Sequence, residues 1–211
     1  SFSGKHFTLP PPGIPDRGST VKNLTLIPKP IAPIDVWQAV TSPPTLDYTA
    51  RVRHHAVLPA RGIEGTKKWW DSFAEKAADG GWELARGEGR CLALNIHVGR
   101  TGAEARESGR NAHDEWIKFL SPYGRFKHYA MADGSETPFD HKPSVEDSIE
   151  QQMMAIGSVE EVADLMGRYR DEVGVEHFVL FFDMPGLTRE QMDEQLEITA
   201  NEVLPRLGVT L

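Results

Sequence analysis

Short apolar runs alternate with amphipathic stretches over most of this chain. Four apolar runs predict strands, at residues 34–40, 56–59, 90–98 and 177–182. The third run is Arg-Cys-Leu-Ala-Leu-Asn-Ile-His-Val, and a run this continuous is typical of a strand buried on both faces of a parallel sheet.

Between the strands, apolar residues recur at the three- and four-residue spacing of helices. Thr101 and Glu104, and again Ser158 and Glu161, have the spacing of a capping box, which marks a helix start. We expect a turn at 62–65, a long polar loop at 120–145, and helices over 46–53, 67–78, 101–119, 158 to about 173 and 189 to about 204.

The repeated strand–helix order predicts an α/β fold with a parallel sheet and right-handed crossovers. A doubly wound sheet and a segment of a (β/α)₈ barrel both fit this order. A doubly wound nucleotide-binding sheet needs a glycine-rich turn after its first strand, whereas residues 40–44 here read Val-Thr-Ser-Pro-Pro. The barrel segment is therefore favoured, although periodicity alone leaves both architectures open.

The first 33 residues differ from the rest of the chain in being rich in proline. Seven of the fifteen prolines lie there, and proline fixes φ and removes a backbone donor. We expect an extended arm over residues 1–33, with a strand-like alternation only at residues 22–27, followed by a folded domain over 34–211.

Charge and cysteine content narrow the function classes. The net charge is −8 and no basic run is present, so we expect no nucleic-acid partner. We expect no membrane span either, because no apolar stretch approaches the required length of roughly 20 residues. The single cysteine, Cys91, lies inside a predicted strand and cannot form an internal disulfide, which favours a reducing, cytoplasmic location.

Five segments resemble, in order, the luciferase-like flavin-dependent monooxygenases. The segments are Phe-Ser-Gly-Lys-His-Phe at 2–7, the proline-rich stretch 26–34 leading into a strand that ends in Val-Thr-Ser, Ile-Gly-Ser-Val-Glu-Glu-Val at 156–162, Gly-Val-Glu-His-Phe-Val-Leu at 174–180, and Asn-Glu-Val-Leu-Pro-Arg-Leu at 201–207. Their order covers nearly the whole chain.

The resemblance implies the carboxyl-terminal half of a (β/α)₈ barrel, with the strands here corresponding to barrel strands five to eight. Four strands cannot close a barrel, so two edges would stay open and inward-facing apolar side chains would meet water. We therefore expect an amino-terminal half or a partner chain to complete the barrel, and a dimer. The catalytic residues are expected in that other half.

The turn after the first predicted barrel strand is the best candidate for binding a cofactor. Thr41, Ser42 and Thr45 offer hydroxyls just before a helix, where the helix dipole favours an anion. The resemblance implies that Ser42 and Thr45 contact the phosphate of FMN. Ordinary helix capping by the same residues is the alternative.

Other strand ends are expected to line a substrate pocket, because barrel sites lie at the carboxyl ends of the strands. These residues are Leu58, Pro59, His97, Phe182 and Met184. The acids and histidines of residues 128–141 lack metal-ligand spacing, so we expect no metal site and interpret them as a solvated loop, with a lid or a partner contact as the alternative.

The resemblance further implies a two-component monooxygenase. Such an enzyme takes reduced FMN from an NAD(P)H-flavin reductase and uses O₂ to oxygenate a small organic substrate. Two alternatives stay open: an oxidoreductase of the same superfamily that uses deazaflavin F420, and a non-catalytic subunit that stabilises a partner barrel.

Overall fold

The computed structural model describes residues 1–25 and 27–209. The chain divides into two compact units, Ser1–Asp35 and Val36–Leu211. The division falls two residues after the boundary expected from the end of the proline-rich stretch. Each unit is described by itself.

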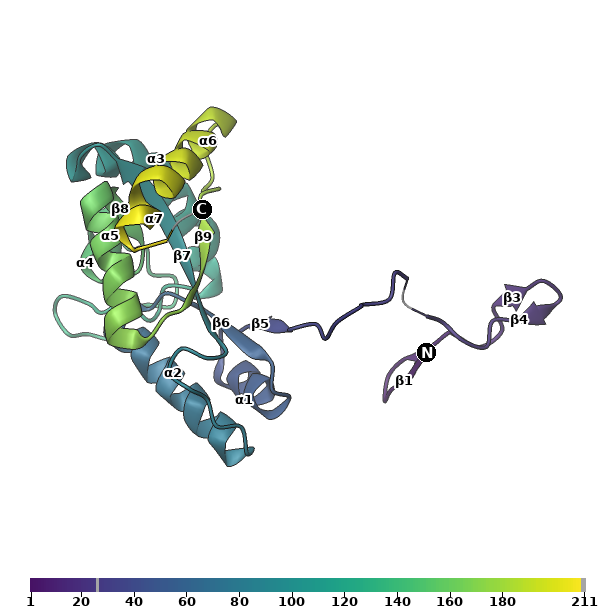
Figure 1. Cartoon of the computed structure of the whole chain (residues 1–211). Helices are drawn as coiled ribbons and strands as arrows, with labels where there is room; N and C mark the ends of the chain where they lie inside the picture. Colours follow the sequence, from purple (N-terminus) through teal and green to yellow (C-terminus); the bar gives the residue numbers. More distant parts are fainter. Residues whose placement is uncertain (26, 210–211) are drawn as a thin grey trace. The chain divides into compact units, whose positions relative to one another are not determined.

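The first unit, the arm, contains two short antiparallel hairpins. Strand β1 (Phe2–Ser3) pairs with β2 (Thr8–Leu9), and β3 (Pro15–Asp16) pairs with β4 (Ser19–Thr20) (Figure 1). The strand predicted at 22–27 is wrong for the described residues 22–25 and 27, and residue 26 lies outside them. Leu24 bonds the amino terminus instead of another strand: its carbonyl accepts from the Ser1 ammonium at 2.7 Å, and its N–H donates to Ser1 Oγ at 3.0 Å.

The second unit is built on a parallel sheet of five strands: β5 (Trp37–Ala39), β6 (His55–Pro59), β7 (Arg90–Gly99), β8 (Ala155–Ser158) and β9 (His177–Phe181). Strands β6 and β9 both pair with residues 91–93 of β7, so they lie on its two edges. The predicted α/β fold with a parallel sheet is confirmed.

Strand β8 is absent from the sequence-based prediction. It pairs with residues 96–99 of β7, beyond the residues that β6 and β9 occupy. Only four residues long, it runs directly into the helix that Ser158 caps, so its local pattern is hidden by the helix signal. The long strand β7 makes this additional pairing possible, because it also pairs with β6 and β9 (Figure 1).

Most helices lie where the spacing predicts them. They are α1 (Pro43–Arg51), α2 (Gly62–Asp79), α3 (Gly102–Leu120), α4 (Val145–Glu150), α5 (Val159–Arg168), α6 (Arg189–Ile198) and α7 (Leu204–Arg206), with the π-helical turns η2 (Tyr169–Val173) and η3 (Thr199–Val203) and the 3₁₀ turn η1 (Ser121–Tyr123). The capping box of Ser158 and Glu161 is formed.

The segment 62–65, expected as a turn, is instead the first turn of α2. Gly62 makes this start possible because it adopts φ +69°, a left-handed value that side chains disfavour. A Cβ at this position would also lie 2.7 Å from the carbonyl oxygen of Gln151. The glycine therefore marks a close backbone approach as well as a helix start.

The two faces of the sheet differ in burial, following the two-residue period of strands. Side chains on the helix-covered face are buried, among them Leu58, Leu92 and Leu94. On the opposite face Trp37 is 39% exposed, Val179 42% and Phe181 39%. Apolar side chains of the uncovered face thus meet water, as the open half of a barrel requires.

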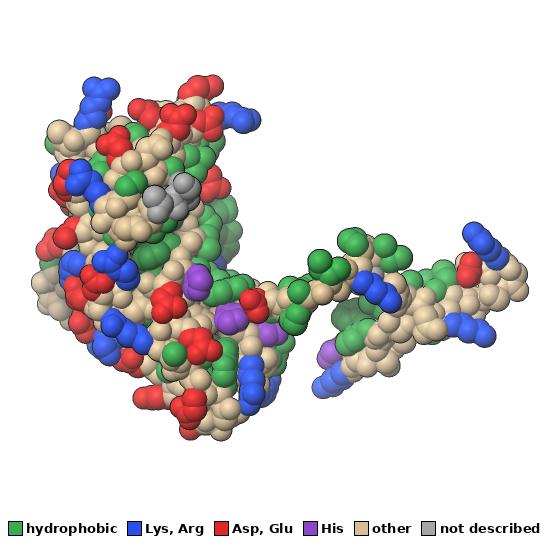
Figure 2. Space-filling model, in the orientation of Figure 1, with side chains coloured by type: hydrophobic (Ala, Val, Ile, Leu, Met, Phe, Trp, Pro, Cys, Tyr) green, Lys and Arg blue, Asp and Glu red, His purple; other side chains and the backbone are tan. Residues whose placement is uncertain are grey.

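Acidic and basic side chains are interspersed over much of the molecular face shown in Figure 2. Within residues 1–25 and 27–209, no helix combines the length and the apolar character needed to cross a membrane.

Candidate functional site at the carboxyl ends of the strands

A cavity of about 400 Å³ lies at the carboxyl ends of the barrel strands. Thr41, just after β5, Pro59 at the end of β6, Asn95 in β7 and Phe181 at the end of β9 all line it. Active sites of (β/α)₈ barrels lie at this end, because loops of variable sequence meet there on a rigid frame. This cavity is therefore the candidate functional site.

One wall of the cavity is apolar. It is formed by part of the smaller of the two hydrophobic clusters, which packs α3, the segment 126–129 and the residues before β8 together. The cavity-lining members of this wall are Trp116, Leu120, Phe126, Tyr129, Met153 and Met154. An organic group without charge can be buried against it.

Hydrogen bonds fix the segment 126–130, which contributes to this wall. The side-chain amide of Gln151 accepts from the N–H of Ala130 at 2.7 Å and donates to its carbonyl at 3.0 Å. Tyr129 Oη lies 3.0 Å from Ser148 Oγ, which also hydrogen-bonds with His113 Nε2 at 2.9 Å. Burial raises the pKa of Tyr129 to about 12, so its hydroxyl keeps its proton at neutral pH.

Arg61 lies at the start of α2, just after β6, and projects into the cavity region. Its guanidinium lies over the indole of Trp69, with Cζ 3.9 Å from the ring centroid. Its Nη2 donates to the carbonyl of Thr41 at 3.3 Å, and its backbone N–H donates to Thr66 Oγ1 at 3.1 Å. Burial, and then the charge of Arg125, lower the pKa of Arg61 from its ordinary value.

Further basic residues line the same cavity on the loop after η1: Arg125, Lys127 and His128. Burial, followed by the charges of Arg61 and Lys127, lowers the pKa of His128 to about 4, so its ring is neutral at pH 7. No aspartate or glutamate is among the lining residues, although the chain as a whole carries a net charge of −8.

Two polar atoms in the cavity wall are buried without a hydrogen-bond partner in the described ranges. They are Arg61 Nε and Asn95 Nδ2. A buried donor that stays unpaired is costly, so each of these atoms is available to a ligand that brings an acceptor.

The hydroxyls of Ser42 and Thr45, which are expected to contact a phosphate, lie close together at the start of α1. Ser42 Oγ lies 2.9 Å from Thr45 Oγ1, and Ser42 is the N-cap of α1 without a side-chain bond to the helix backbone. Pro43 and Pro44 carry no N–H, so the first helical donor is the N–H of Thr45. The pair of hydroxyls and this one N–H are the groups that could hold a phosphate.

The expected pocket residues fall in different places. Pro59 lines the cavity, together with Thr41 from the expected cofactor site, whereas Leu58 faces the helix-covered core with 2% exposure. Phe182 packs against the same core, and its neighbour Phe181 reaches the cavity instead. Successive strand residues point to opposite faces, and a strand-end position alone does not say which face is inside.

His97 and Met184 are both buried away from the cavity lining. His97 Nε2 lies 2.8 Å from Ser108 Oγ, and a Cβ on Gly109 would lie 2.7 Å from the His97 ring, so this histidine packs against α3. Burial lowers the pKa of His97. Cys91 is buried in β7, as expected, and burial raises its pKa.

Sequence reasoning missed the basic residues of the cavity. Arg61 is the second residue after β6, and a position just after a barrel strand does indicate a site residue. The turn expected at 62–65 drew attention away from it. Arg125, Lys127 and His128 lie on a loop whose direction no local pattern reveals.

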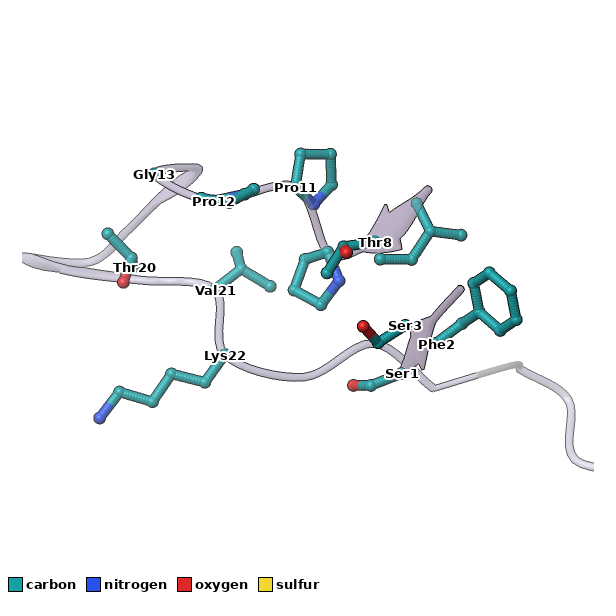
Figure 3. A pocket seen from close by; sticks show the side chains of 12 residues that line it. Ser1, Phe2, Ser3, Thr8, Pro11, Pro12, Gly13, Thr20, Val21 and Lys22 are labelled. Carbon is teal, nitrogen blue, oxygen red and sulfur yellow. The ribbon is translucent and has the colours of Figure 1, made fainter. Parts of the chain in front are cut away.

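A second cavity, of about 570 Å³, lies within the arm (Figure 3). Its lining includes Pro10, Pro11 and Pro12 with small hydroxyl side chains, and Lys22 is its one charged side chain. None of the side chains described in the arm cavity has a buried polar atom without a partner, whereas Arg61 and Asn95 do, so the strand-end cavity is the better candidate. No group of three or more residues able to hold a metal was found in the ranges 1–25 and 27–209.

Comparison with known families decides the fold assignment. The family described as luciferase-like monooxygenase matches residues 1–177. This chain belongs to the luciferase-like monooxygenase family. No curated protein matches it.

Solved structures share the fold at low sequence identity. A monooxygenase, RslO1, from Streptomyces bottropensis superposes with a TM-score of 0.61 at 17% identity, over 82% of this chain and 48% of that one. The oxygenating constituent of 3,6-diketocamphane monooxygenase from Pseudomonas putida, in complex with FMN, gives 0.60 at 16% identity, over 82% and 48%.

The long-chain alkane monooxygenase LadA gives a TM-score of 0.56 at 20% identity, over 100% of this chain and 47% of that one. The chain thus spans about half the length of each of these structures. The likeness shows that the unit built on β5–β9 has the partial barrel fold of this family.

Proposed function

We propose that this chain supplies the carboxyl-terminal half of a flavin-dependent monooxygenase that uses reduced FMN and O₂ to oxygenate a small organic substrate. The family match makes an oxidoreductase the expected class. The observation that carries the proposal is the hydroxyl pair of Ser42 and Thr45, 2.9 Å apart, beside a cavity at the carboxyl ends of the strands.

The residues present fit the phosphate of FMN. Ser42 and Thr45 offer a pair of hydroxyls, which hydrogen-bond with each other, and the N–H of Thr45, at the positive end of the α1 dipole. FMN supplies the oxygen chemistry when it is bound. The chain's own part is to bind the phosphate and to shield the reacting groups from water with the apolar wall of the cavity. We assign no catalytic base to this chain.

The exposed face of the sheet supports a barrel completed by further strands. Trp37, Val179 and Phe181 present apolar surface on the side opposite the covering helices. Burying that surface against an amino-terminal half, whether on the same polypeptide or on a partner chain, would stabilise the assembly. A flavin reductase is the second proposed partner, supported by the name "oxygenating constituent" of a similar protein.

Flavin binding tests the proposal. In the purified full-length protein, the double variant Ser42→Ala/Thr45→Val should weaken FMN binding by roughly 10- to 100-fold, because hydrogen bonds to a charged group are worth about 1.5–3 kcal/mol. Ser72→Ala is the control: Ser72 lies inside α2, outside both the hydroxyl pair and the cavity lining, and the FMN affinity of this variant should stay near wild type.

Unchanged FMN affinity in the double variant would favour a non-catalytic subunit over a flavin enzyme. Anaerobic titration with reduced FMN and with reduced F420 separates the two cofactors. For the barrel, the intact mass of the purified protein is compared with 23.5 kDa, and its sedimentation is measured. A folded, monomeric species of that mass alone would overturn barrel completion.

A further inference from the structure

The basic side chains of the strand-end cavity have no acidic counterpart. Arg61, Arg125 and Lys127 converge on it, and none of them has an ion pair within the described ranges. Acidic residues outnumber basic ones in this chain, 31 to 23, so a cavity whose charged lining residues are all basic runs against the overall composition. Like charges held close together raise the free energy of the fold unless an anion joins them.

Arg61 is held in a fixed pose rather than free in solvent. The Trp69 ring supports one face of its guanidinium, and the Thr41 carbonyl accepts from Nη2. Its Nε is buried without a partner in the part of the chain that is described. A planar guanidinium with an unused donor edge matches the two oxygens of a carboxylate, sulfonate or phosphate.

The apolar wall of the cavity has different chemistry. Trp116, Phe126, Met153 and Met154 form an apolar surface that favours a hydrocarbon or aromatic group. A ligand that uses both walls has an apolar body and one anionic group.

We propose that the strand-end cavity binds an organic anion, and that Arg61 is the residue that recognises the anionic group. This inference rests on the proposed function, because it names the class of the substrate. The phosphate of FMN is a second anion with the charge that Arg61 would recognise. Ser42 and Thr45 form their own hydroxyl site and do not line the cavity, which favours the substrate as the source of the anion.

Two probes of equal shape test the charge requirement. 2-Naphthoate and its neutral analogue 2-naphthamide are titrated calorimetrically into the full-length protein, with and without saturating FMN. The naphthoate should bind at least about tenfold more tightly in both conditions, because a charge-assisted pair with arginine replaces a neutral contact.

Arg61→Gln should bring the affinity for naphthoate to within about twofold of that for naphthamide, and should leave naphthamide binding and FMN binding unchanged. Arg51→Gln, on the last turn of α1, is the control and should preserve the discrimination. If Arg61→Gln fails to fold, Arg125→Gln serves instead, since that side chain is exposed, and it should lose part of the discrimination.

Equal affinity for the two probes in wild type would overturn the proposal. So would competition between FMN and naphthoate together with weaker FMN binding in Arg61→Gln, because the cations would then hold the flavin phosphate. Both tests are binding measurements and need no turnover. FMN binding by the Ser42→Ala/Thr45→Val variant tests the proposed function, and the difference between naphthoate and naphthamide affinity tests this inference, so the two can fail separately.

Discussion

The guanidinium of Arg61 lies over the indole ring of Trp69, with Cζ 3.9 Å from the ring centroid. Both residues belong to the first turns of α2 or its N-cap, so one helix start supplies both the cation and its support. The contact orients Arg61 toward a cavity lined by strand ends.

Removing the indole should loosen that orientation. Trp69→Leu is expected to weaken 2-naphthoate binding by about three- to tenfold, because a partly desolvated cation–π contact is worth on the order of 1 kcal/mol. Trp69→Phe keeps an aromatic face and should retain most of the affinity. Calorimetric titration measures both, and wild-type affinity in Trp69→Leu would show that the stack does not position Arg61.

Gly62 is expected to tolerate no side chain. Gly62→Ala should lower the free energy of unfolding by about 1–3 kcal/mol, because it combines a left-handed φ with a Cβ close to a carbonyl oxygen. Gly134→Ala is the matched control, since Gly134 has φ +73° but open space around it. Urea unfolding should rank Gly62→Ala as clearly the more destabilised; equal losses would mean that the close approach to Gln151 adds nothing.

Ser148 joins two buried polar groups. Ser148→Ala should cost about 1–3 kcal/mol of unfolding free energy, because Tyr129 Oη and His113 Nε2 then both lose a partner. Tyr129→Phe removes one bond and should cost less. The double variant should be less destabilised than the sum of the two single variants, and strict additivity in chemical denaturation would contradict a shared bond.

His128 should make stability depend on pH in the acidic range. Its pKa of about 4 in the folded protein is below the ordinary value of 6.5, so the unfolded chain binds the proton more readily. Stability should therefore fall as pH drops from about 6.5 towards 4, where the unfolded state is protonated first.

His128→Gln removes this titration and should flatten the corresponding part of the curve. Thermal unfolding between pH 4 and 7 measures the slope for both proteins. A slope unchanged by the substitution would show that other groups cause the acid sensitivity.

Val179 tests the uncovered face of the sheet. Val179→Asp should hinder completion of the barrel, because a carboxylate would be buried against the added strands. Leu196→Asp is the control: Leu196 is an exposed apolar residue on α6, with 49% exposure. Sedimentation should show less assembled protein, and the yield should fall, only for Val179→Asp. A Val179→Asp variant that is soluble and fully assembled would contradict the proposal that added strands cover this face.

The local pattern of residues was enough to predict most of the elements. The apolar run through Cys91 specified β7, and the Ser158–Glu161 spacing specified the start of α5. These features depend on neighbours within one turn of helix or a few residues of strand. The sequence pattern alone can therefore predict them, without knowledge of tertiary contacts. The Ser42–Thr45 contact belongs to the same class, since one helical turn brings the two hydroxyls together.

Only the tertiary structure decided which side chains share the cavity. Arg61 and His128 are far apart along the chain. They line the same cavity because the fold brings the loop after η1 to the carboxyl end of β6. The choice of Phe181 over Phe182, and of Pro59 over Leu58, required knowing which sheet face the helices cover. Strand β8 likewise exists through its pairing with β7, because four residues ahead of a capped helix carry too weak a signal of their own.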